Sequence, residues 1–278
     1  MGEMRVPTWY YQQYDADFAL DVPAEGFGGW RTSVLPMSLD TTALIVMHAW
    51  DCGTREQYAG WHRVVEYIPR SYDICHRVMP GLLTAARSAG MTVYHVVRPG
   101  SGYFRDYPGY RRAVRLAGPE QPKTRQVEYD ETFRRLSAFR AASVFPGDHN
   151  RADIAAGQRR MDFPAAARPA GDEGIAESSA QLHALCRADG INHLVYAGFA
   201  INGCLQTSPG GMVDMQREGY LCSAIRQAVT AIENKETARA ETAKEIALWQ
   251  VALLYGFVYD AGDLMAALNA HNGPAAAP

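Results

Sequence analysis

Short apolar runs alternate with stretches of helical periodicity along much of the chain. Residues 41–48 (TTALIVMH) and 91–99 (MTVYHVVRP) are continuous apolar runs, a pattern typical of strands buried on both faces. Between them, residues 70–90 carry apolar side chains at helical spacing, and Pro80 is predicted to kink or break this helix. This order of strand, helix and strand predicts a βαβ unit and therefore a parallel sheet.

The alternation returns in the last third of the chain. We expect strands over residues 191–198 and 220–228, helices over 178–190, 205–219 (interrupted around 208–211) and 241–256, and a last strand and short helix in 257–270. Five strands alternating with helices predict an α/β fold of three layers, α/β/α, with a mostly parallel central sheet.

Three segments lack this regular pattern. Residues 1–40, rich in aromatics, proline and glycine, are interpreted as an irregular N-terminal arm that covers its own domain or a neighbouring subunit. Residues 99–171, dense in Arg and Tyr, form an insertion in the single domain 41–270, with a helix near 128–140. Such an insertion serves as a lid, binding loop or subunit contact, or is only a solvated surface excursion. Residues 271–278 are expected to be a disordered tail.

Composition excludes several classes of protein. The 278 residues carry a net charge of −3, which gives no indication of nucleic-acid or anionic membrane partners. No run is long and apolar enough for a transmembrane helix, and the N-terminus does not have the pattern of a secretory signal. The five scattered cysteines lack zinc-finger spacing, so we expect a cytoplasmic protein.

Cys204 occupies a position suited to a nucleophile. It follows the apolar run that ends at Gly198 and precedes a helical stretch, and Gly198 and Gly203 permit tight turning there. Ligands of open α/β sheets bind beyond the carboxyl ends of the strands. A helix N-terminus would stabilise the thiolate, and backbone N–H groups of the same turn could bind an oxyanion. The alternative is that Cys204 is a small buried hydrophobe.

The order and spacing of several segments resemble the isochorismatase-like cysteine hydrolases. Residues 194–220 (LVYAGFAINGCLQTSPGGMVDMQREGY) resemble the nucleophile segment of that family, and residues 41–53 (TTALIVMHAWDCG) resemble its first strand. GDEGI at 171–175 and QLHALCRADGI at 181–191 also fit. The resemblance implies a three-layer α/β fold, a homo-oligomer such as a dimer or tetramer, and hydrolysis by an Asp, a Lys and a Cys.

The resemblance assigns roles to particular residues. Cys204 takes the position of the nucleophile, which attacks an amide-type carbonyl in the family. A cis peptide helps to build the oxyanion hole of these enzymes, and by match it falls at Phe199–Ala200. The amides of Ala200 and Cys204 then fall where the oxyanion donors lie.

Two catalytic positions depart from the family pattern. His48 stands where the family has its Asp, and Asp51 follows three residues later. A Cys–His pair can exist as thiolate and imidazolium, so His48 is a candidate acid and base that Asp51 would orient. Alternatively, His48 and Asp51 only cap the strand and the loop. The region of the family Lys offers Glu177, whereas Lys123, Arg159 and Arg160 are weaker substitutes.

Two hypotheses about function therefore stay open. The first is a cysteine hydrolase that cleaves a C–N bond of a small substrate with an altered triad and no cofactor. The second is a non-catalytic binding or assembly protein on the same scaffold. The metal pattern of the nicotinamidase branch is missing after residues 92–100, so we expect no catalytic metal. No GxGxxG or Walker loop follows the first strand, which disfavours a nucleotide-binding enzyme.

Overall fold

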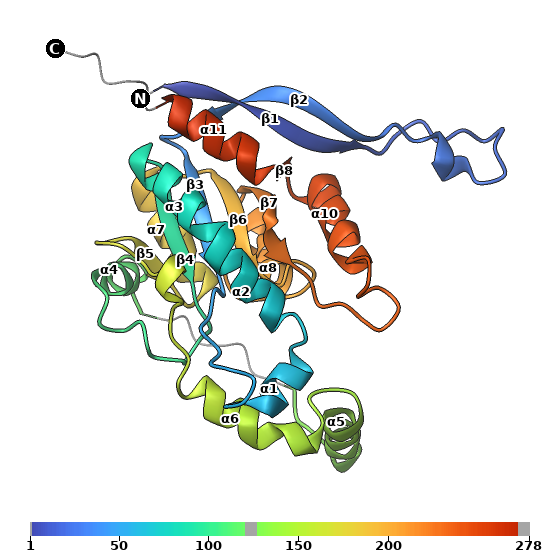
Figure 1. Cartoon of the computed structure of the whole chain (residues 1–278), viewed down its shortest axis with the longest axis vertical. Helices are drawn as coiled ribbons and strands as arrows, with labels where there is room; N and C mark the ends of the chain where they lie inside the picture. Colours follow the sequence, from blue (N-terminus) through green and yellow to red (C-terminus); the bar gives the residue numbers. More distant parts are fainter. Residues whose placement is uncertain (1, 120–126, 272–278) are drawn as a thin grey trace.

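The computed structural model describes residues 2–119 and 127–271 and contains one eight-stranded sheet (Figure 1). The strand order is β2-β1-β8-β7-β6-β3-β4-β5, and β1 pairs antiparallel with both of its neighbours whereas the other pairs are parallel. The strands are β1 (Glu3–Gln12), β2 (Gly29–Ser38), β3 (Thr42–Met47), β4 (Thr92–Val96), β5 (Gly174–Ala176), β6 (His193–Phe199), β7 (Leu221–Thr230) and β8 (Val258–Tyr259).

The central strands are apolar on both faces because helices cover both. In β3 all six residues are buried, and successive side chains point to opposite sides of the sheet. Leu44 and Val46 belong to one core, while Ala43, Ile45 and Met47 belong to the other. The continuous apolar runs of the sequence are explained by this double burial.

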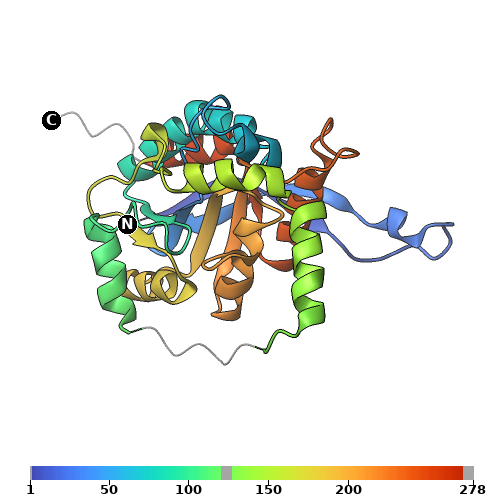
Figure 2. The ribbon, with the colours of Figure 1, turned by 90° about the horizontal axis from the view of Figure 1, so that it is seen from below.

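Two helical layers cover the sheet, as Figure 2 shows from below. One face is covered by α2 (Ile68–Arg77), α3 (Met79–Ser88) and α11 (Ala261–His271). The other is covered by α4 (Pro108–Ala117), α7 (Ser179–Asp189), α8 (Cys204–Thr207), α9 (Met212–Arg217) and α10 (Thr242–Leu254). The predicted three-layer α/β/α fold with a mostly parallel sheet is therefore confirmed.

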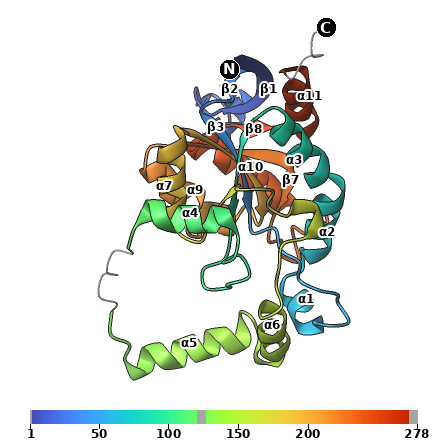
Figure 3. The ribbon, with the colours of Figure 1, turned by 90° about the vertical axis from the view of Figure 1, so that its left-hand side faces the viewer.

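A third group of helices lies beyond one end of the sheet (Figures 1 and 3). It consists of α1 (Ala59–Val64), α5 (Glu131–Ser143) and α6 (Arg151–Gln158), and the short 3-10 turn Asp148–Asn150 packs against α1 and α6. Two further 3-10 turns, Pro23–Gly26 and Ala165–Ala167, lie elsewhere in the chain. The amide of Gly60 donates to Asp153 at 2.6 Å, and Arg63 donates to Asn150 at 3.1 Å. These bonds join α1 to α6, whereas α5 has no buried residue.

Several local expectations are confirmed in detail. The helix predicted over residues 70–90 is broken at Val78 into α2 and α3, with Pro80 in the first turn of the second helix. The helix predicted over 205–219 is divided into α8 and α9. In both cases proline and glycine mark the break because they do not fit a helix interior.

The prediction that residues 1–40 are irregular is wrong. They form the antiparallel hairpin of β1 and β2, in register from Glu3 opposite Ser38 to Gln12 opposite Gly29. β1 also pairs with β8, so it belongs to the main sheet. Only one face of β1 is buried, through Met4, Val6 and Thr8, and this weak pattern was obscured by the many aromatics.

The insertion 99–171 is also more regular than expected, since it contains α4 and α6 in addition to the predicted helix near 128–140, which is α5. The short strand β5 was missed as well, because three residues give no usable periodicity. Residues 272–278 of the expected tail lie outside the described residues. No helix in the described ranges is long and apolar enough to cross a membrane.

Candidate active site

The candidate site lies where β3 and β6 end side by side. Met47, the last residue of β3, is paired with Gly198 of β6, so His48 and Phe199 meet at the same edge of the sheet. Gly198 has a φ of 128°, and a Cβ there would lie 1.8 Å from the Met47 carbonyl oxygen. Only glycine permits this close approach of the two strands.

Cys204 lies on a tight turn that follows β6. The peptide bond between Phe199 and Ala200 is cis, at the position that the family resemblance indicated. The Ala200 carbonyl accepts from the amides of Gly203 and Leu205, at 3.1 Å each. Within residues 2–119 and 127–271, no acceptor takes a hydrogen bond from the amides of Ala200 or Cys204. The turn therefore presents two unbonded N–H groups beside a partly exposed thiol.

The helix that begins at Cys204 is shorter than the sequence suggested. α8 contains four residues and ends before Ser208. A single turn aligns few peptide dipoles, so it stabilises an adjacent thiolate less than a long helix would. The expected stabilisation of a Cys204 thiolate by a helix N-terminus therefore has only a single helical turn behind it.

Neighbouring segments hold this turn in place. The Ile201 amide donates to the Thr230 carbonyl at 2.9 Å, and Asn202 exchanges two side-chain hydrogen bonds with the backbone of Ile232, at 2.8 Å each. Arg70 of α2 donates to the Thr230 hydroxyl at 2.9 Å and is paired with Glu66. The loop after β7 and the start of α2 thus hold the turn that contains Cys204.

His48 is buried and uncharged. Its side chain is 4 % exposed, its φ is 54°, and its amide donates to the Val96 carbonyl at 2.9 Å. The ring stacks on Trp50 with centroids 4.7 Å apart, and neither ring nitrogen has a hydrogen-bond partner among the described residues. Burial, and secondly the charge of Arg98, lower the pKa of His48 to about 3. The predicted imidazolium partner for a thiolate is therefore absent at neutral pH.

A small cavity lies against His48. Its volume is about 20 Å³, and its walls are mostly aromatic and aliphatic: His48, Trp50, Cys52, Trp61, Val65, Tyr67, Ile68, Ser71 and Phe199. This volume is on the scale of one or two water molecules. The His48 ring nitrogens and the Trp50 indole nitrogen are both unpartnered among the described residues, so the cavity fits a small uncharged group that hydrogen-bonds to them.

Asp51 does not orient His48, which corrects the hypothesis of a Cys–His–Asp triad. Its carboxylate accepts from the Tyr72 hydroxyl at 2.6 Å and from the Gly53 amide at 3.0 Å. Its backbone amide donates to the Asp162 carbonyl at 2.8 Å. Asp51 therefore stabilises the loop after β3, as the simpler interpretation of this residue proposed.

Glu177, the residue that the sequence offers in the region of the family Lys, has a structural role. Glu177 follows β5 and accepts hydrogen bonds from the Gly100 amide, at 2.8 Å, and from the Tyr110 hydroxyl. Arg159 and Arg160 are exposed on and after α6, and Lys123 lies outside the described residues. Glu177 thus joins the loop after β4 to α4 and supplies no positive charge.

Sequence reasoning missed two residues near the site. Arg98 follows β4, and its charge acts on His48; its place just after an apolar run was a usable signal. Tyr67 precedes α2, and its pKa is raised mainly by burial and secondly by the charge of Cys204, which lies close to it. No pattern in the sequence indicated that Tyr67 would face the thiol.

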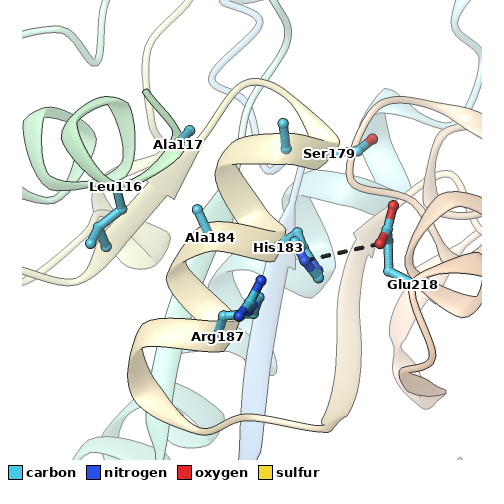
Figure 4. Close-up of a pocket in the computed structure, with 8 residues that line it drawn as sticks. Leu116, Ala117, Ser179, His183, Ala184, Arg187 and Glu218 are labelled. Atoms are coloured by element: carbon cyan, nitrogen blue, oxygen red, sulfur yellow. Dashed lines mark ion pairs between the residues drawn. The ribbon is translucent and has the colours of Figure 1, made fainter. Parts of the chain in front are cut away.

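Other candidate sites are weaker. No three His, Cys, Asp or Glu side chains in the described ranges are grouped to hold a metal ion. An open groove of about 430 Å³ lies between α4 and α7 (Figure 4). Two of its polar side chains have partners: Ser179 donates to Asp214, and His183 contacts the Tyr220 hydroxyl at 3.0 Å and Glu218 at 3.9 Å. Arg187 also lines the groove, but it is an exposed side chain in the last turn of α7, and one exposed charge does not define a ligand site.

This chain is similar to several solved protein structures. No family model matches the chain, and no curated protein matches it. A cysteine hydrolase from Pseudomonas syringae pv. phaseolicola aligns with 16 % identity and a TM-score of 0.48, over 85 % of this chain and 96 % of the other. An isochorismatase family protein from Burkholderia thailandensis aligns with 16 % identity and a TM-score of 0.46, over 83 % and 96 % of the two chains.

A third structure, N-carbamoylsarcosine amidase from Thermoplasma acidophilum, aligns with 14 % identity and a TM-score of 0.39, over 80 % of this chain and 96 % of the other.

Proposed function

We propose that this protein is a divergent isochorismatase-like cysteine hydrolase that cleaves a C–N bond of a small amide-type substrate through Cys204. The observation that carries the proposal is the turn after β6. It combines a partly exposed thiol with the unbonded amides of Ala200 and Cys204, at the edge of the sheet where ligands of α/β proteins bind.

The proposed reaction has two steps. The Cys204 sulfur forms a bond to the carbonyl carbon, and the two amides stabilise the negative oxygen of the tetrahedral intermediate. The C–N bond then breaks, and the amine leaves with the proton that the Cys204 thiol lost on attack. Water hydrolyses the resulting thioester, which releases the acid and regenerates the thiol.

His48 has a limited part in proton transfer. Because its pKa is about 3, the neutral imidazole is a weak base, although it would readily return a proton to a leaving amine. We therefore propose slow turnover on ordinary amides. The cavity beside His48 favours a substrate whose inserted end is small and uncharged.

Labelling and turnover of one pair of variants test the proposal. Cys204 is partly exposed while Cys52, Cys75, Cys186 and Cys222 are buried. Intact protein should therefore take up one iodoacetamide label rapidly, as seen by mass spectrometry. Cys204→Ala should lose both this label and any turnover of a panel of small amides, and Cys186→Ala should keep both. Turnover that persists in Cys204→Ala would refute the mechanism.

The second candidate function is a non-catalytic binding or assembly protein on the same scaffold. It is favoured by Glu177 in the Lys position and by the uncharged His48. If no amide of the panel is turned over and Cys204 is labelled slowly, this second function is supported instead of the first. Under either function we propose a homo-oligomer in the cytoplasm, because the described cysteines are all free and large apolar side chains are exposed.

A further inference from the structure

Helix α5 exposes a row of large apolar side chains to solvent. Phe133, Leu136 and Phe139 are 46 %, 65 % and 67 % exposed, and the spacing of three residues places them on one face of the helix. A helix of 13 residues is only marginally stable without tertiary packing. The Phe133 ring stacks on Tyr129, with centroids 4.2 Å apart, but Tyr129 is itself exposed. Figure 3 shows α5 standing away from the sheet with α6 beside it, and no residue of α5 is buried by the described part of the chain.

An aromatic groove lies at the other end of the molecule. It has a volume of about 480 Å³ between the β1–β2 hairpin and α10, and its apolar walls come from Tyr11, Phe27, Trp30, Ile246 and Trp249. Trp249 donates to Gln13 at 3.0 Å, which holds the hairpin against α10. Grooves of this composition typically accept the apolar face of an amphipathic helix.

The charges of the two surfaces are complementary. The hairpin tip, residues 13–28, contains Asp15, Asp17, Asp21 and Glu25 and no Lys or Arg. On α5, helical periodicity places Arg135 and Arg140 along the apolar row. Opposite charges around an apolar centre favour one docking register over others.

The positions of the groove and of α5 allow two copies of the chain to contact each other reciprocally. In Figure 1, where the longest axis is vertical, the hairpin projects to the right near the top and α5 lies to the right near the bottom. A two-fold axis perpendicular to the long axis exchanges top and bottom. One rotation of this kind brings each hairpin groove to the α5 of the other copy, which gives two equivalent contacts.

We propose that α5 of one copy docks, through Phe133, Leu136 and Phe139, in the groove between the β1–β2 hairpin and α10 of a second copy. The contact is reciprocal, so the product is a closed dimer. The acidic hairpin tip contacts the arginines of α5 and sets the register of the helix in the groove.

Light scattering of the full chain over a range of micromolar concentrations is the first test. Wild-type protein should have the mass of a dimer, and Phe139→Asp should have the mass of a monomer with an unchanged far-ultraviolet circular dichroism spectrum. Ala138→Asp, on the opposite face of α5, is the matched control and should stay dimeric. A monomeric wild type, or a dimeric Phe139→Asp, overturns the proposal.

A charge exchange provides a second test that does not depend on an apolar substitution. Arg135→Glu with Arg140→Glu places acids against the acidic hairpin, and Asp21→Lys with Glu25→Lys places bases against the arginines of α5. Each double variant alone should be monomeric. Mixed in equal amounts, they should form a heterodimer, because both of its contacts again join opposite charges. Failure of the mixture to associate, while each variant alone is a folded monomer, would exclude the proposed register.

Discussion

At the scale of single residues, His48 is the most unusual group of the site. A buried histidine with no hydrogen-bond partner among the described residues and with a pKa of about 3 stays neutral over most of the pH range. Its unfolded counterpart, with a pKa of about 6.5, takes up a proton below that value. Folding therefore becomes less favourable as the pH falls from about 6.5 toward 3, and the effect ends below pH 3.

The first prediction follows from this loss of folding stability as the pH falls. Between pH 7.5 and pH 5.0, the free energy of unfolding of the wild type should fall by about 2 kcal/mol more than that of His48→Gln, at about 1.4 kcal/mol per pH unit. Urea titrations at the two pH values measure the difference. His149→Gln, at an exposed position, should keep the wild-type pH dependence. Equal pH dependence in wild type and His48→Gln would show that His48 is not buried in neutral form.

At the scale of elements, the junction of β3 and β6 sets the geometry of the site. A second prediction concerns Gly198→Ala, whose Cβ would meet the Met47 carbonyl oxygen at 1.8 Å. Forcing the strands apart should destabilise the fold by about 3 kcal/mol or more, as severe overpacking does. Gly190→Ala is the matched control, since Gly190 also has positive φ but no atom within 4 Å of a Cβ, and strain alone should cost about 1 kcal/mol. Thermal unfolding compares the two variants. Similar losses of stability would show that the added Cβ does not collide with the Met47 carbonyl.

The third prediction concerns the link between α2 and the nucleophile turn. Arg70→Ala removes the bonds from α2 to the Thr230 hydroxyl and the Ala231 carbonyl, which position the loop that binds Ile201. Hydrogen exchange of the Ile201 amide should quicken about fivefold, the equivalent of one net hydrogen bond of about 1 kcal/mol. Arg77→Ala, which breaks the exposed pair with Asp73 on the same helix, should leave this exchange unchanged. If both variants exchange alike, α2 does not hold the turn.

At the scale of the whole molecule, the N-terminal segment has two separable roles. β1 completes the sheet beside β8 and buries Met4, Val6 and Thr8, whereas the hairpin tip contributes only to the groove beside α10. The core therefore depends on β1, and the proposed dimer depends on the tip.

The fourth prediction separates these roles. Replacing residues 13–28 with Asn-Gly closes β1 and β2 by a two-residue turn, so the fold should persist while the dimer is lost. Deleting residues 1–35 should instead expose the core and give aggregated protein. Circular dichroism and light scattering distinguish the outcomes. A dimer that survives replacement of the tip would show that association uses another surface.

The layers of the fold and the place of Cys204, the proposed nucleophile, could be predicted from the sequence alone. Residues 43–47 are apolar at every position, a pattern that a strand covered on both faces requires. The breaks at Val78 and Ser208 were visible as proline and glycine. Cys204 could be located because a strand, a glycine and a helix follow one another along the chain. Apolar runs, helix breaks and the order of neighbouring elements depend on residues that are close in sequence, so they can be recognised without the structure.

Only the tertiary structure decided the chemistry around that cysteine. Burial by α1, α2 and Trp50 makes His48 neutral, and the charge of Arg98, which follows β4, acts on it. Asp51 accepts a hydrogen bond from Tyr72 instead. The pairing of β1 with β8 likewise joins opposite ends of the chain. A pKa or a strand pairing depends on neighbours that are distant in sequence, because solvation and Coulomb forces act through space rather than along the chain.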